Sequence, residues 1–221
     1  GAALRTLTEA TTPALARRVA ALVQEAVRLR PETAGQVAGC VDRRLEQGPT
    51  ARPVLLPLVT GLLDGGPEQV RAALATVLAA AGTPASRPLR RELLESLLDR
   101  ERDPAVLDAV LHAAAAQGDA DMDRSGGGDM GRSGAGDPVE APYRREDEIR
   151  GLVHRTGLLL VRTPEGATLL DRGLADLGRH VPGFAARMAR WLTEAPDDWA
   201  GMVGPGARRT IENLAGVRVP A

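Results

Sequence analysis

Apolar residues recur along most of this chain at the spacing of an amphipathic helix. Leu55, Leu58, Val59, Leu62 and Leu63 follow one another at i, i+3, i+4, i+7 and i+8, which places all five on one face. Ala and Leu, which favour helices, dominate the composition, whereas Ile and the aromatic residues, which favour strands, are scarce. The sequence therefore predicts an all-α fold.

The helical pattern repeats between residues 12 and 118 with a period of about 36 residues. Each unit holds two helical segments, and a single helix hairpin cannot bury its apolar stripe alone, whereas a stack of three can. Successive shifts of about 36 residues align three stripes: Val19, Leu22, Val23, Ala26 and Val27; Leu55, Leu58, Val59, Leu62 and Leu63; Leu93, Leu94, Leu97 and Leu98.

Proline and glycine mark the two ends of the second helix in each unit. A proline opens the helix, where the missing N–H costs nothing, and Asp103 stands before one of these prolines as a candidate N-cap. A glycine follows the helix, where a left-handed residue is expected. The prolines are Pro31, Pro67 and Pro104, and the glycines are Gly48, Gly82 and Gly118. Pro57 either lies in the first turn of its helix or kinks it.

The period, the apolar stripes and the placement of proline and glycine resemble those of HEAT and armadillo repeats over residues 12–118. The resemblance implies an α-solenoid of about three helix hairpins. Solenoids of this kind present an extended surface, which we expect to be concave, to a protein partner.

Composition divides the chain into a helical-repeat domain (1–117), a linker (118–142) and a C-terminal helical subdomain (143–221). The linker carries 2 Arg against 6 acidic residues, whereas the charges of the segments before and after it nearly balance. It is rich in glycine and poor in large apolar groups, so it cannot offset the entropy of ordering. We therefore predict that the linker is disordered.

Three motif matches fall inside the linker, and none has the context that its chemistry needs. Glycines at 126, 128 and 131 fit two phosphate-binding patterns, but no strand precedes them and no helix follows. Aspartates at 119, 121 and 123 resemble the start of a calcium loop, but Met130 stands where the bidentate glutamate belongs. We expect no cofactor and no metal here.

The helical period returns after the linker. Thr163 and Pro164 make a good helix start, whereas Val181-Pro182 and Gly204-Pro205-Gly206 interrupt the pattern. Apolar stripes lie between these breaks: Ile149, Leu152, Val153, Thr156 and Leu160; Leu169, Leu170, Leu174 and Leu177; Phe184, Met188, Trp191 and Leu192. All four aromatic residues follow residue 142, which suggests a bulky cap on the last face of the repeat array.

The chain contains Arg but no Lys, which indicates a high-GC genome such as that of an actinobacterium. In that setting, the segment from Leu152 to Ala221 resembles the helical C-terminal region of large multidomain actinobacterial proteins, and three motifs carry the resemblance. They are residues 160–166 (Leu-Val-Arg-Thr-Pro-Glu-Gly), 180–184 (His-Val-Pro-Gly-Phe) and 191–196 (Trp-Leu-Thr-Glu-Ala-Pro). The resemblance implies that this chain is the C-terminal part of a larger protein, and it implies no site residues.

Candidate catalytic residues do not form a recognisable pattern. No two histidines have the spacing of a zinc protease, and no serine lies in a nucleophile elbow. Cys40 stands alone on a helical pattern, so we expect a small, partly or fully buried side chain, and a reducing cytoplasmic location fits. Glu194, Asp197 and Asp198 surround a helix start, where acids complement the dipole. We therefore predict that the chain is not an enzyme.

Paired arginines are the remaining candidates for a binding surface. Three pairs fall in the repeat segment: Arg17 and Arg18, Arg43 and Arg44, Arg90 and Arg91. Stacked repeats could align them into a basic ridge for an acidic protein partner or for a nucleic-acid backbone. Acidic neighbours, a net charge of −1 and the absence of interleaved aromatics favour ordinary solvated helix faces and disfavour nucleic acid.

These observations favour a non-catalytic helical-repeat scaffold for protein–protein interaction. A second hypothesis is a regulatory or substrate-recruiting tail of an enzyme, a protease or NTPase, whose catalytic domain lies outside this chain. A third is a nucleic-acid-binding solenoid. We expect no membrane partner, because the longest apolar runs are too short to span a bilayer.

Overall fold

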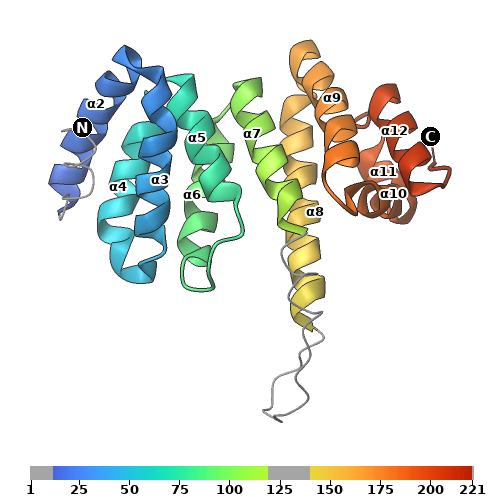
Figure 1. The fold of residues 1–221 in the computed structure, drawn as a ribbon, viewed down its shortest axis with the longest axis horizontal. Coiled ribbons are helices and arrows are strands. Elements are labelled where there is room, and N and C mark those ends of the chain that lie inside the picture. Colours follow the sequence, from blue (N-terminus) through green and yellow to red (C-terminus); the bar gives the residue numbers. More distant parts are fainter. Residues whose placement is uncertain (1–11, 119–139, 221) are drawn as a thin grey trace, which may run out of the picture. The chain divides into compact units, whose positions relative to one another are not determined.

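The computed structural model describes residues 12–118 and 140–220 (Figure 1). Within these ranges every regular element is a helix, which confirms the predicted all-α fold. The chain forms two compact units, residues 1–113 and 114–221, and each is described by itself below. Among the described residues, no helix combines the length and the apolar character needed to cross a bilayer.

Helices α2 to α7 build the first unit, with α7 running two residues past its boundary. Helices α2, α4 and α6 lie side by side in one row, and α3 lies against α5 in a second row (Figure 1). The elements are α2 (Pro13–Leu29), η1 (Pro31–Thr33), α3 (Ala34–Leu45), η2 (Gly48–Ala51), α4 (Arg52–Leu63), α5 (Glu68–Ala79), α6 (Arg87–Arg100) and α7 (Pro104–Ala115).

The three predicted apolar stripes supply much of the core of this unit, and buried residues of α3, α5 and α7 supply most of the rest. The buried members of the stripes are Val19, Val23 and Val27; Leu55, Leu58, Val59 and Leu62; Leu93, Leu94, Leu97 and Leu98. Leu22 is the main exception, because its side chain is 61% exposed. On α2 it lies one residue before buried Val23, so it falls about 100° around the helix from that core position. The repeat alignment therefore overstated the width of the first stripe.

The predicted helix ends are largely confirmed. Pro31 opens η1, Pro67 is the N-cap of α5, and Pro104 is the first residue of α7. The Asp103 carboxylate caps α7, accepting a hydrogen bond from the Ala105 N–H at 3.1 Å. Pro57 lies in the interior of α4, past the first turn.

Two of the three repeat glycines adopt the left-handed conformation that was predicted. Gly48 has a φ of 73° and Gly82 a φ of 54°. They are not the cap residues themselves, because Glu46 and Ala80 occupy those positions. The glycines turn the chain inside the connection instead. Gly118 lies at the end of η3 (Ala116–Gly118).

The second unit is built from α8 (Glu140–Leu160), α9 (Pro164–His180), α10 (Phe184–Glu194), α11 (Pro196–Trp199) and α12 (Pro205–Ala215). Helix α9 packs against α8, α10 and α12. Thr163 caps α9 as predicted, with its hydroxyl accepting from the Gly166 N–H at 3.1 Å. The breaks at Val181-Pro182 and Gly204-Pro205-Gly206 coincide with the end of α9 and the start of α12.

Aromatic side chains form the centre of this unit. Trp191 and Trp199 stack with ring centroids 5.8 Å apart, and Phe184 meets Trp191 edge-on at 6.3 Å. All three are at most 1% exposed. The bulky residues of the C-terminal segment therefore serve as its own core.

The predicted division into 1–117, 118–142 and 143–221 stays a prediction. Residues 119–139, which make up most of the predicted linker, lie outside the described residues, and so do the glycine and aspartate motif matches within it. Helix α8 begins at Glu140, three residues before the predicted start of the C-terminal subdomain.

Candidate binding site

The six paired arginines do not share one row of helices. Arg17 and Arg18 lie on α2 and Arg90 and Arg91 on α6, whereas Arg43 and Arg44 lie on α3, in the second row. Arg17, Arg18, Arg43 and Arg91 are exposed, and Arg44 is half-buried. These six arginines therefore do not form the continuous basic ridge that the sequence suggested.

Arg90 is a buried structural residue with 4% exposure. Its guanidinium donates to Asp42 and to Glu46 at 2.5 Å each. It also donates to the Ser86 hydroxyl at 3.1 Å and to the carbonyl of Val77 at 2.5 Å. With its donors directed inward, Arg90 is not available to a partner, which corrects its assignment as a partner-binding residue.

The Arg90 cluster also perturbs an acid. Hydrogen bonds from Thr83 and Arg90 lower the pKa of Glu46 to about 2, although burial works in the opposite direction. Gly82 is required beside this cluster, because a Cβ there would collide with Ser86 and Arg90. The cluster joins α3 to α6 and to the turn that precedes α6.

A second arginine cluster joins α5 to the connection between α6 and α7. Arg71 forms an ion pair with Glu101, which is 7% exposed, and with Asp103 at 3.1 Å. Burial lowers the pKa of Arg71, but hydrogen bonds and charge from Glu101 and Asp103 outweigh it and raise that pKa. Asp103 therefore both caps α7 and binds Arg71.

Further polar contacts link neighbours in the α2–α4–α6 row. Arg52 of α4 donates to both oxygens of Glu92 on α6, at 2.6 and 2.9 Å. This contact raises the pKa of Arg52 and lowers that of Glu92. The remaining links are Gln24 to the Gly61 carbonyl, Arg28 to the Gly65 carbonyl and Arg100 to Asp64.

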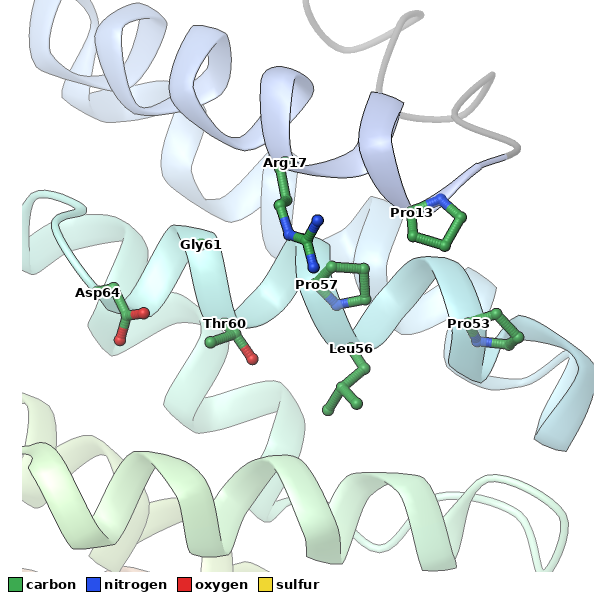
Figure 2. Close-up of a pocket in the computed structure, with 8 residues that line it drawn as sticks. All are labelled: Pro13, Arg17, Pro53, Leu56, Pro57, Thr60, Gly61 and Asp64. Carbon is green, nitrogen blue, oxygen red and sulfur yellow. The ribbon is translucent and has the colours of Figure 1, made fainter.

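Arg17 borders a surface groove between α2 and α4, with a volume of about 460 Å³. Figure 2 shows its side chain reaching from α2 toward Pro57 of α4. Arg17 is exposed and forms no hydrogen bond or ion pair with a described residue. The groove is lined by Pro13, Arg17, Pro53, Leu56, Pro57, Thr60, Gly61 and Asp64.

The sequence of α4 explains the shape and the chemistry of this groove. Pro57 has no N–H, so the Pro53 carbonyl lacks the donor that a regular α-helix would supply. Gly61 allows the close approach of the two helices, because a Cβ there would lie 2.9 Å from the Ala20 Cβ. The groove thus combines proline rings and Leu56 with an arginine and an aspartate.

Each of the three histidines contacts a backbone carbonyl, and the single cysteine is buried. Nδ1 of His112 and Nδ1 of His180 each lie within 2.9 Å of a backbone carbonyl one helical turn earlier. His154 lies 2.9 Å from the Asp198 carbonyl and meets Trp199 edge-on. Cys40 is buried, as predicted. Across 12–118 and 140–220, no three His, Cys, Asp or Glu side chains come together as a metal site would require.

No family model matches this chain, and neither a curated protein nor a solved structure matches it. The groove between α2 and α4 brings apolar, cationic and anionic groups together in one hollow of the first unit.

Proposed function

We propose that this chain is a non-catalytic helical-repeat scaffold, an α-solenoid of the HEAT and armadillo kind, that binds a protein partner through the α2–α4 groove. The polar links between helices support the repeat interpretation. Gln24 reaches the Gly61 carbonyl and Arg28 the Gly65 carbonyl, each 37 residues away, and Asp64 pairs with Arg100, 36 residues away. These links recur at the period of the sequence pattern, as repeated neighbour contacts do in a solenoid.

The observation that carries the binding proposal is Arg17, which is exposed beside an apolar hollow and has no ion pair with a described residue. Proline rings and Leu56 offer apolar surface to a partner side chain, and the planar guanidinium of Arg17 suits a carboxylate. We therefore expect the partner to insert a short segment with an acidic residue facing Arg17.

A protein partner is favoured over nucleic acid. Backbone recognition of nucleic acid needs several arginines along one path, and affinity then falls steeply with salt. Here Arg90 is withdrawn into the interior and the other pairs are divided between two rows of helices. The groove also contains no aromatic side chain on which a base could stack.

Affinity capture with matched variants tests the proposal. The full chain is used as bait in extract from its native host, as wild type, Arg17→Glu, Leu56→Asp or the control Arg87→Glu. Arg87 is an exposed residue of α6 outside the groove. The account expects a protein that is captured by wild type and by the control and is lost with both groove variants. Equal capture by all four baits would contradict it.

A further inference from the structure

A second hollow, with a volume of about 450 Å³, lies within the second unit between α9 and α12. Its lining includes three arginines, Arg172, Arg179 and Arg209, with Asp171 as its acidic residue. The concentration of cations distinguishes it from the α2–α4 groove, where one arginine stands with one aspartate. The two hollows therefore suit ligands of different chemistry.

The fold holds these arginines around one space. Arg172 and Arg179 lie seven residues apart on α9, which is two helical turns or about 10 Å along the same face. Arg209 comes from α12, whose first turn is fixed on α9 because Asp171 accepts from the Ala207 N–H at 2.7 Å. A Cβ at Gly206 would collide with Asp171, so the glycine is needed for this close approach.

The arginine charge in the hollow is only partly paired by the described residues. Arg172 and Arg209 are exposed and form no hydrogen bond or ion pair with a described residue. Arg179 pairs with Asp176 at 3.2 Å, but both side chains are 46% exposed, so the pair is weak and can be exchanged. Three guanidinium groups against the one lining carboxylate attract an anion, and their planar forks match the oxygens of a phosphate.

The remaining polar groups accept hydrogen bonds. Thr168 donates its hydroxyl hydrogen to the Pro164 carbonyl, and Thr210 donates to the Gly206 carbonyl, each at 2.9 Å. Their oxygens are thus left as acceptors, as is the Asp171 carboxylate. A ligand that fits must present an anionic group to the arginines and hydroxyl donors to these acceptors.

We infer that the α9–α12 hollow binds a small phosphate monoester that also carries hydroxyl groups. The phosphate lies among Arg172, Arg179 and Arg209, and the ligand hydroxyls donate to Thr168, Thr210 or Asp171. The volume of the hollow falls in the range of small-ligand sites, about 300–1,000 Å³. This inference is independent of the protein-binding groove on the first unit.

Calorimetric titration of the full chain tests the inference, with glycerol 3-phosphate as probe and chloride holding the ionic strength constant. Saturable binding is expected, at least several-fold tighter than for inorganic phosphate, which lacks the hydroxyls. Arg172→Gln and Arg209→Gln should each weaken binding about tenfold, as loss of one charge-assisted contact predicts. The control is Arg218→Gln, an exposed arginine outside the hollow, and it should bind as wild type does.

Four results would overturn the inference, and three of them concern the phosphate ester and its control. These three are the absence of saturable binding, equal affinity for inorganic phosphate and glycerol 3-phosphate, and equal weakening by Arg218→Gln. A hexaglutamate peptide that bound more tightly than the phosphate ester would likewise overturn it, in favour of an acidic protein partner. Circular dichroism of each variant, unchanged from wild type, ensures that lost binding reflects the removed charge.

Discussion

Replacing Arg90 by leucine tests whether the buried arginine holds the first unit together. The substitution removes donors to Asp42, Glu46, Ser86 and the Val77 carbonyl at once. Breaking a buried ion pair by removing one partner costs about 3–5 kcal/mol. The side chains of Asp42 and Glu46 are 45% and 33% exposed, so water can solvate them again. We therefore expect a loss of about 3 kcal/mol, at the lower end of that range.

Urea denaturation followed by far-ultraviolet circular dichroism measures this loss. Fluorescence is unsuitable, because both tryptophans belong to the second unit. The matched control is Arg87→Leu, an exposed position on the same helix, where the change should stay within about 0.5 kcal/mol. If Arg90→Leu were as stable as this control, the structural role of the cluster would be refuted.

Three further changes have defined outcomes. The pKa of Glu46 is lowered from 4.5 to about 2 in the folded protein, so the stability that this carboxylate contributes is present above pH 4.5 and is lost as the pH falls toward 2. Glu46→Gln should therefore make the free energy of unfolding less dependent on pH in this range, and an unchanged dependence would contradict the assignment. Gly61→Val should cost about 1–3 kcal/mol in urea denaturation, because it overpacks the contact with Ala20, whereas Gly39→Ala, with only an ordinary contact nearby, should stabilise by about 0.5–1 kcal/mol. Thr163→Ala should lower the melting temperature by removing the α9 cap, worth about 1 kcal/mol, and no shift would argue against that hydrogen bond.

The pattern of apolar residues was sufficient to predict the helices, because burial on one face and helix period are local properties of a sequence. Thr163 and Asp103 were identified as caps for the same reason, since a cap acts within one turn. Leu22 shows the limit of this reasoning. Its spacing matches the stripe, but exposure depends on which neighbouring helices cover that face.

The buried arginine clusters could not be predicted, because their partners are distant in sequence. Arg90 meets Asp42 and Glu46 from 48 and 44 residues away. Adjacent arginines such as Arg90 and Arg91 point about 100° apart on a helix, so one enters the interior while the other faces solvent. The sequence of the pair does not show which of the two arginines is buried.

One local signal did point toward the α2–α4 groove. Pro57 is a helix-breaking residue within a helical pattern, and in the structure it lies inside α4 and lines the groove. Arg17 was among the six candidate arginines. Only the packing of the helices shows that Arg17 is exposed whereas Arg90 is buried. A residue that breaks a local rule without an evident structural reason is thus a useful marker of a surface to examine.

Photo-cross-linking from the α2–α4 groove tests the central claim most directly. A benzophenone side chain at position 56 of the full chain is activated in the native host, and cross-linked products are identified by mass spectrometry. The account predicts a protein product that disappears with Arg17→Glu and persists with Arg87→Glu. No cross-linked protein, or a product insensitive to Arg17→Glu, would contradict it.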